Sequence, residues 1–395
     1  MKRILNVILL SVFLLTLKSQ AQISRPISTA VPFLLISPDS RAAALGDAGV
    51  ASSPDANAIY WNTAKLAFIN KQMGVTASYT PWLADIIDDM GLAHAAIYKK
   101  LNKDQAVSMS LTYFDQGKIN FTTQTGADNG TYQSNDFNLT AGYTRKLARD
   151  FSMGINLKYI NSNPAVGSSG LTGIKPARGV AGDISFYYTD ERPSVKTQEK
   201  GWKFSAGAVI SNLSGKLSYK NGNGDSRSAS FVPTNLKLGG MANYKINPNH
   251  QLNFLVDVNK LLVPTPPIRD ANGKILKGRN PETTGVFSGI FGSFTDAPDG
   301  LKEELREFTG SLGVEYWYND FFALRGGYFL ESRYKGNRKY LTAGLGFRFM
   351  ENYHVDFAYL VPTTQGSALA NTWRISLIVD LNKNKVAETE VPESN

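Results

Sequence analysis

Apolar and polar side chains alternate along many short segments of this 395-residue chain. In residues 373–381, five apolar side chains share one face, while Arg374 and Asp380 lie on the other. Residues 341–349 and 151–159 repeat the pattern. A period of two is typical of β-strands, because successive side chains of a strand point to opposite sides of the sheet. The alternation therefore predicts an all-β fold.

The same alternation predicts a membrane barrel. No apolar stretch of about 18 residues follows residue 22, so the sequence offers no helical membrane span. A spanning sheet must close on itself, with apolar side chains outward and polar ones inward. About fourteen comparable segments fit a bacterial barrel, which has an even number of antiparallel strands. They lie near residues 72–80, 90–98, 105–114, 135–145, 151–161, 180–188, 202–211, 232–244, 251–260, 308–318, 321–330, 340–349, 353–361 and 372–381.

The linkers between these segments alternate in length. The short linkers are residues 146–150, 245–250, 319–320 and 350–352. The long linkers are residues 115–135, 162–179, 212–231, 261–307 and 362–371. Bacterial barrels have short periplasmic turns and long extracellular loops, with both termini in the periplasm. We therefore expect a multi-pass outer-membrane barrel with periplasmic termini; only linker 189–201 is longer than this rule predicts.

The two ends of the chain lie outside the predicted barrel. Lys2 and Arg3 precede an apolar run and the small-residue pattern of residues 19–21, so residues 1–21 are interpreted as a secretory signal peptide. The chain contains no cysteine, which excludes a lipoprotein attachment site and disulfides. We expect an N-terminal plug over 22–70, the barrel over 71–381 and a periplasmic tail over 382–395.

The inward face of the predicted strands carries charges of both signs. Those charges are Lys158, Asp183, Lys237, Asp257, Glu315, Arg325, Arg348, Asp356 and Arg374. This face is too charged for the dry core of a secreted β-sandwich. Ion pairs that fill the lumen and a water-filled selective channel both fit the charges. The formal net charge of +9 is scattered rather than clustered on one face, so no nucleic-acid partner is expected.

The predicted plug and several later segments carry a family resemblance. Pro38-Asp39-Ser40-Arg41 is followed by AALGDAGVA and then by IYWNTAKLA. The residues of this N-terminal signature are Asp39, Arg41, Gly46, Gly49, Asp55, Tyr60, Trp61 and Asn62. Later segments include GIFGSFTDAPDGLKEELREF, GVEYWYN, FALRGGYF and DFAYLVP. Together they resemble the PorV family, within the wider class of fourteen-stranded FadL-like barrels. Thr63 departs from the proline usual in that class, which affects only local plug geometry.

The resemblance implies a component of the type IX secretion system of Bacteroidota. Similar proteins bind the C-terminal signal domains of cargo that emerges from the SprA (Sov) translocon. They deliver this cargo to the attachment complex that contains PorU. The apolar outward face of the predicted barrel implies outer-membrane lipid as a further partner.

One segment of the longest predicted extracellular loop, residues 261–307, suits a binding role. It carries apolar residues at helix-like spacing: Val286, Phe287, Ile290, Phe291 and Phe294. If exposed, this face is a candidate docking surface for cargo or translocon. A lid folded over the barrel mouth fits the same pattern.

No catalytic constellation is visible, so we expect no enzyme, cofactor or metal site. The three histidines are His94, His250 and His354, and the chain lacks a Gly-x-Ser-x-Gly elbow, a His-Glu-x-x-His motif and a Walker A loop. Two other functions stay open. One is FadL-like transport of hydrophobic small molecules across the outer membrane, and the lesser one is a lipopolysaccharide-modifying hydrolase.

Overall fold

The structure, a computed structural model, describes residues 24–163, 175–196, 199–220, 229–350 and 352–383. The expected signal peptide, residues 1–21, lies outside the described residues. Of the expected tail, residues 382 and 383 belong to the last strand, and 384–395 lie outside the described residues.

Fourteen strands of the described chain form one closed antiparallel barrel, which confirms the predicted fold class. Each strand pairs with its neighbour in sequence, and the first strand closes the barrel against the last, with Lys71 opposite Lys383 and Tyr79 opposite Ile375. The strands are β1 (Lys71–Pro81), β2 (Gly91–Lys100), β3 (Gln105–Thr122), β4 (Asp128–Ala148), β5 (Phe151–Asn163), β6 (Ala177–Thr189), β7 (Gly201–Ser214), β8 (Asn235–Asn247), β9 (His250–Leu261), β12 (Phe308–Tyr318), β13 (Phe322–Leu330), β14 (Lys339–Phe349), β15 (Tyr353–Pro362) and β16 (Trp373–Lys383).

Short helices and one small hairpin complete the described structure. The plug contains η1 (Pro32–Leu35), α2 (Ser40–Ala43), α3 (Ala58–Trp61) and η2 (Thr63–Phe68). The linkers contain α4 (Pro193–Lys196), β10 (Ile268–Arg269), β11 (Ile275–Lys277), α5 (Val286–Gly292), α6 (Leu301–Glu304) and η3 (Leu305–Glu307). Within the described residues, no helix is long and apolar enough to cross a membrane.

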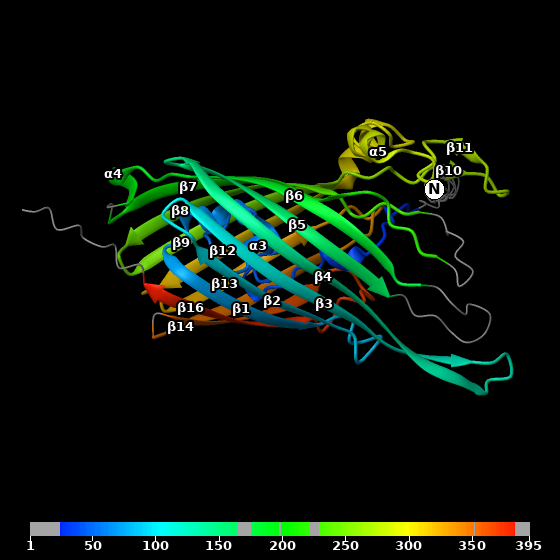
Figure 1. Ribbon diagram of the computed structural model, residues 1–395, viewed down its shortest axis with the longest axis horizontal. Helices are drawn as coiled ribbons and strands as arrows, with labels where there is room; N and C mark the ends of the chain where they lie inside the picture. The colour runs from blue at the N-terminus through cyan, green and yellow to red at the C-terminus, as the bar shows by residue number, and fades with distance from the viewer. Residues whose placement is uncertain (1–23, 164–174, 197–198, 221–228, 351, 384–395) are drawn as a thin grey trace, which may run out of the picture.

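The two ends of the barrel differ, and we call them the short-turn rim and the long-loop rim. In Figure 1 the turn with α4 lies at the short-turn rim, and α5 lies at the long-loop rim. The expected loop 115–135 is mostly strand, which corrects the sequence interpretation. There β3 continues to Thr122 and β4 starts at Asp128, so the two strands pair as a hairpin that projects beyond the wall (Figure 1).

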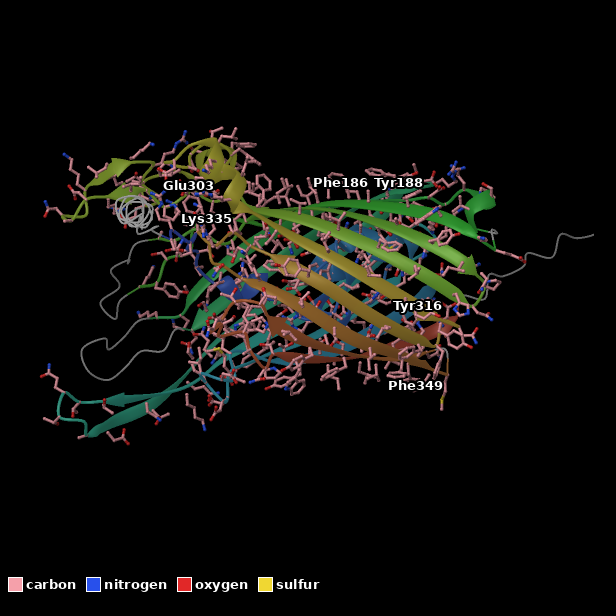
Figure 2. All side chains as sticks on the ribbon, turned by 180° about the vertical axis from the view of Figure 1, so that it is seen from behind. Phe186, Tyr188, Glu303, Tyr316, Lys335 and Phe349 are labelled. Atoms are coloured by element: carbon pink, nitrogen blue, oxygen red, sulfur yellow. The ribbon has the colours of Figure 1, made fainter. Side chains whose placement is uncertain are left out.

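The outer face of the barrel is apolar. Leu111, Leu157 and Leu324 are among its exposed large side chains. Exposed aromatic side chains flank this band; Figure 2 shows Tyr188 and Phe349 near the short-turn rim. An apolar band between aromatic girdles is the surface that a bilayer requires of a transmembrane barrel.

Residues 24–70 run through the lumen as the plug, from the long-loop rim to the short-turn rim. At the first rim, the backbone N–H of Arg25 donates to the carbonyl of Tyr334 at 3.0 Å. At the other rim, Lys71 begins β1 beside Lys383, the end of β16. Residues 24 and 383, the two described ends, therefore lie at opposite rims; the termini expected in the periplasm lie outside the described residues. The plug crosses the lumen once, and this single passage separates the two described ends.

Candidate functional site

The plug is built around a short capped helix. The Asp39 carboxylate accepts the backbone N–H of Ala42 at 2.9 Å and so caps the start of α2. The same carboxylate accepts the indole N–H of Trp61, which joins α2 to α3. A capping carboxylate satisfies a helix N–H that has no partner within the helix. Asp39 therefore fixes the local fold of the plug from both sides.

Arg41 links the plug to the barrel wall through buried ion pairs. Its guanidinium donates to both carboxylate oxygens of Glu315 at 2.9 Å and lies 3.1 Å from Asp55 within the plug. Glu315 also accepts Arg325 Nε at 2.8 Å, and Arg325 lies 2.6 Å from Asp356. Five charges, two from the plug and one from each of three strands, thus form one network at the barrel centre.

Two plug glycines allow close approach to other groups. Gly46 has φ +68°, and a Cβ there would meet the backbone of Tyr328 at 2.6–2.8 Å. A Cβ on Gly49 would strike the Trp61 ring. The backbone N–H groups of Gly49 and Val50 donate to Asp257 Oδ2 of β9 at 2.8 and 2.9 Å. Glycine is required at Gly46 because the backbone packs directly against the wall, and at Gly49 because the Trp61 ring of the plug occupies the space of a side chain.

The end of α3 is attached to a different part of the wall. Asn62 Nδ2 donates at 3.0 Å to the carbonyls of Val50 in the plug and Phe186 in β6. Thr63 Oγ1 donates to Asn156 Oδ1 of β5 at 2.7 Å. The departure from proline at Thr63 thus places a side-chain hydrogen bond between plug and barrel.

The other lumen charges differ in their partners. Lys158 lies 2.9 Å from Asp183, and Arg374 lies 3.4 Å from Asp47 of the plug. Arg348 lies 3.8 Å from Asp320 and 4.4 Å from the Trp317 ring.

Lys237 is the exception among these charges. It lies near the rings of Tyr60 and Trp61, but within the described residues it has no ion pair or hydrogen bond. The other lumen charges mostly form ion pairs or hydrogen bonds within the wall or between the wall and the plug.

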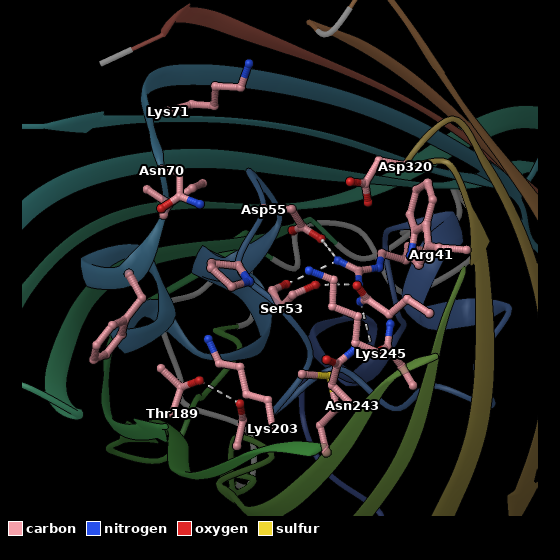
Figure 3. Close-up of a pocket in the computed structure, with 18 of the residues that line it drawn as sticks. Arg41, Ser53, Asp55, Asn70, Lys71, Thr189, Lys203, Asn243, Lys245 and Asp320 are labelled. Atoms are coloured by element: carbon pink, nitrogen blue, oxygen red, sulfur yellow. Dashed lines mark hydrogen bonds and ion pairs between the residues drawn. The ribbon is translucent and has the colours of Figure 1, made fainter. Parts of the chain in front are cut away.

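Two separate cavities lie on either side of the plug. The cavity toward the short-turn rim has a volume of about 630 Å³, and Figure 3 shows Arg41 and Asp55 on its plug side with Lys203 and Lys245 on its wall. The cavity toward the long-loop rim has about 530 Å³ and is lined by aromatic residues that include Tyr60 and Trp61. The described plug lies between them, so the two cavities form no single space.

The candidate loop, residues 261–307, forms α5 over Val286–Gly292, but its apolar residues divide between two environments. Phe287 and Phe291 are 76% and 75% exposed, and Phe294 is also exposed. Ile290 is buried and Val286 is half-buried. Figure 1 places α5 at the outer edge of the long-loop rim rather than across the mouth. The exposed phenylalanines form a small apolar surface, which we call the Phe287 surface.

Ile290 is buried because the helix packs on a neighbouring loop. A Cβ on Gly289 would lie 2.8 Å from the Phe231 ring and 3.2 Å from Pro264. The absence of a side chain at Gly289 lets α5 lie directly on these residues. The prediction that all five apolar residues share one exposed face is therefore wrong for Ile290.

A buried charge cluster holds the base of this loop. Lys260 of β9 lies 2.7 Å from Glu307 and 3.2 Å from Glu304. Lys335, in the linker between β13 and β14, lies 2.7 Å from Glu303 and 2.9 Å from Glu307. Figure 2 shows Glu303 and Lys335 together at the long-loop rim. We call Lys260, Glu303, Glu304, Glu307 and Lys335 the anchor cluster.

The N-terminal segment also joins the anchor cluster. Arg25 lies 3.0 Å from Glu303. Burial alone would raise the pKa of Glu303, but the hydrogen bond from Lys335 and the nearby positive charge of Arg25 outweigh it and lower that pKa. Sequence reasoning missed this cluster, although the acidic run KEELRE was its visible signal.

The described histidines make no catalytic arrangement. His94 Nδ1 is 2.9 Å from Thr112 Oγ1, and His250 Nδ1 is 2.6 Å from the Tyr316 hydroxyl. His354 Nε2 is 3.4 Å from Asp380. Among the hydrogen bonds of the described residues, none joins a histidine to a serine, and those residues contain no group of three or more side chains suited to a metal ion.

Comparison with known proteins gives one family and one fold. The family model described as type IX secretion system protein PorV matches residues 18–268. No curated protein matches the sequence.

Among solved structures, the Pseudomonas putida toluene transporter TodX is 12% identical and matches with a TM-score of 0.52, over 87% of this chain and 98% of that chain. A Pseudomonas aeruginosa FadL homologue is 12% identical and has a TM-score of 0.44, over 91% of this chain and 100% of that chain. At this identity the TodX likeness shows the barrel fold alone.

Proposed function

The chain belongs to the family of the type IX secretion system protein PorV, and from this membership we propose that it is a non-enzymatic outer-membrane shuttle for secreted cargo. It binds the C-terminal signal domains of cargo that emerges from the SprA (Sov) translocon. It then delivers this cargo to the attachment complex that contains PorU. The exposed Phe287 surface on an anchored loop is the observation that carries the proposal.

The shuttle works at the long-loop rim, which we orient toward the cell exterior. The contrast between short turns and long loops supports this orientation, because bacterial barrels keep their long loops outside. The short-turn rim, where β16 ends, then faces the periplasm. Cargo that has left a translocon meets the long-loop rim first.

The Phe287 surface has the properties of a docking site. Two phenylalanines four residues apart on α5 expose about three quarters of their side-chain surface. Exposed aromatic side chains are costly in water and are enriched at protein interfaces. The anchor cluster fixes the base of the loop, so little conformational entropy is lost when a partner binds.

The plug supports binding rather than conduction as the main activity. Arg41, Asn62 and Thr63 attach it to three regions of the wall. A passage through the lumen would require these buried contacts to break together. Cargo handling at the rim needs no such change.

The test is co-purification from native outer membranes. A double variant, Phe287→Glu with Phe291→Glu, should no longer co-purify with cargo and translocon. The barrel should stay folded, because both phenylalanine side chains are solvent-exposed. Leu276→Glu is the matched control, since Leu276 is 64% exposed in the same loop but lies outside α5. Normal recovery of cargo and translocon with the double variant would contradict the proposed docking surface.

FadL-like transport of hydrophobic small molecules is the second candidate. The aromatic rings in the cavity near the long-loop rim are the observation behind it, because such rings suit an apolar ligand. Fatty acids that co-purify with the protein in the absence of any protein partner would support transport over the shuttle.

A further inference from the structure

Lys237 is a buried cation that has no anionic partner within ion-pair distance among the described residues. It lies on β8, is 6% exposed, and places Nζ 5.0 Å from the ring centre of Tyr60 and 5.1 Å from that of Trp61. Within the described part of the chain it makes neither an ion pair nor a hydrogen bond. The other buried lysines of wall and rim differ, since Lys158 is paired with Asp183 and Lys260 with Glu307.

An unpaired buried ammonium is expensive. Removal of such a group from water costs several kcal/mol when no counter-charge replaces the hydration shell. The two aromatic faces return only a part of that cost. Asp183 and Asp257 of the wall and Asp47 of the plug act on Lys237 only from beyond ion-pair distance. The position of Lys237 is therefore most favourable when an anion from outside reaches Nζ.

The cavity near the long-loop rim gives such an anion access. Its lining extends from Lys335 and Arg338 at the rim to Tyr60, Trp61 and Lys237. The two cations at the rim are already neutralised, because Lys335 pairs with Glu303 and Arg338 with Glu331. The unpaired charge within the described lining is therefore the one deep in the cavity.

A polar row lies beside Lys237. Asn259 of β9 is opposite Lys237 in the register, and Thr309 of β12 is opposite Asn259. All three line the cavity, as does Asn235, whose buried Oδ1 has no hydrogen-bond partner among the described residues. Amide and hydroxyl groups in a row suit the N–H and C=O groups of an extended backbone.

The rest of the lining is apolar and aromatic. Phe33, Trp82 and Phe114 belong to it, and Phe33 stacks on Phe114 with ring centres 6.2 Å apart. These rings suit apolar side chains that follow a terminal charge. A hydrocarbon tail would use the rings but leave the polar row unsatisfied, so the lining favours a polypeptide over a fatty acid.

We propose that this cavity binds the C-terminal carboxylate of an extended apolar polypeptide segment, with Lys237 Nζ as its charge partner. The assignment rests on the proposed function for the choice of a polypeptide, because cargo presents its C-terminal end. The Phe287 surface then contacts the outside of the cargo domain, while the cavity binds the C-terminal carboxylate of the same domain.

The experiment measures peptide binding to the full-length protein in a non-ionic detergent by isothermal titration calorimetry. The probes are an N-acetylated apolar pentapeptide with a free carboxylate, the same peptide as its amide, and decanoate. The free acid should bind, and the amide should bind about ten- to a hundred-fold more weakly, because a hydrogen bond to a charged group contributes about 1.5–3 kcal/mol. Equal binding of acid and amide would overturn the recognition of a carboxylate.

Substitutions assign the effect to Lys237. Lys237→Met should weaken binding of the acid to the level of the amide, and Lys237→Arg should retain most of it. Lys302→Met removes the same charge from an exposed position outside the cavity and should change nothing. Lys237→Met should also unfold at a temperature no lower than the wild type, because it removes an unpaired buried charge. A clearly lower unfolding temperature together with unchanged peptide binding would make Lys237 a structural residue and overturn the proposal.

Two further outcomes separate this inference from the proposed function. Binding of decanoate without binding of the peptide acid would identify a fatty acid as the source of the carboxylate and refute the polypeptide. If cargo co-purifies with the wild type but the peptide acid does not bind, this inference fails and the shuttle stands. If no cargo co-purifies at all, the shuttle fails whatever the peptide does.

Discussion

Removal of the Glu315 carboxylate should loosen the plug. Glu315 is fully buried on β12 and accepts hydrogen bonds from Arg41 at 2.9 Å, Arg325 at 2.8 Å and Asn253 at 2.8 Å. Glu315→Ala leaves each arginine with one carboxylate, Asp55 or Asp356. The two arginines then lose the carboxylate that joins them, and their N–H groups that pointed at Glu315 are left without an acceptor at a largely buried position.

The expected loss follows from the cost of breaking a buried ion pair. Removal of one partner costs about 3–5 kcal/mol, because the other charge stays buried without compensation. Each arginine retains a second carboxylate, so we expect a value near the lower end, about 3 kcal/mol. A double-mutant cycle with Arg41→Met should give a coupling energy of about 2–3 kcal/mol between Arg41 and Glu315.

The assay is reversible urea unfolding in lipid vesicles, followed by tryptophan fluorescence. Ser311→Ala is the matched control, since Ser311 lies on the inward face of the same strand and its buried hydroxyl has no partner among the described residues. Limited proteolysis of residues 24–70 reports directly on the plug. A free energy of unfolding for Glu315→Ala that equals that of Ser311→Ala would refute the structural role of the network.

Two more predictions concern the plug turn and the anchor cluster. Gly46→Ala should destabilise the barrel by on the order of 3 kcal/mol, because the new Cβ would clash with Tyr328 at a position that already has a positive φ. Gly126→Ala is the control and should cost only about 1 kcal/mol, because Gly126 has a positive φ but lies in open space. Equal losses of unfolding free energy in urea would argue against close packing at Gly46. The lowered pKa of Glu303 implies that its stabilisation of the loop is complete above its ordinary value of 4.5 and is lost as pH falls below it. The hydrogen-exchange protection factors of residues 261–307, which correct for the intrinsic slowing of exchange at low pH, should therefore fall between pH 5 and pH 3 in the wild type, more than in Glu303→Gln. Identical pH profiles of the protection factors would contradict this prediction.

The barrel was predictable because lipid imposes a periodic rule on every strand. The alternation in residues 151–159 or 373–381 reflects contact with lipid on one side and the lumen on the other. Residues 115–135 lie beyond the wall, where no lipid enforces that rule, so their pairing as a hairpin left no comparable periodic signal.

The contacts of the plug were not predictable, because they join residues far apart in the chain. Arg41 was identified through its family motif, but its pairing with Glu315 spans 274 positions. Ile290 was expected on the face of Phe287 and Phe291, and only the packing of Gly289 on Phe231 shows that it is buried. Helical spacing gives the relative direction of side chains and not which of them meet a neighbouring loop.

The central claim, that cargo is held at the long-loop rim, is tested most directly by photo-crosslinking in living cells. A photoreactive amino acid replaces Phe291 on α5 or, as a control, Leu147, which is 57% exposed near the short-turn rim. We predict crosslinks at position 291 to proteins that carry type IX C-terminal signal domains, and none at position 147. Crosslinks to cargo at position 147 alone, or no cargo at either position in cells that secrete it, would contradict the account.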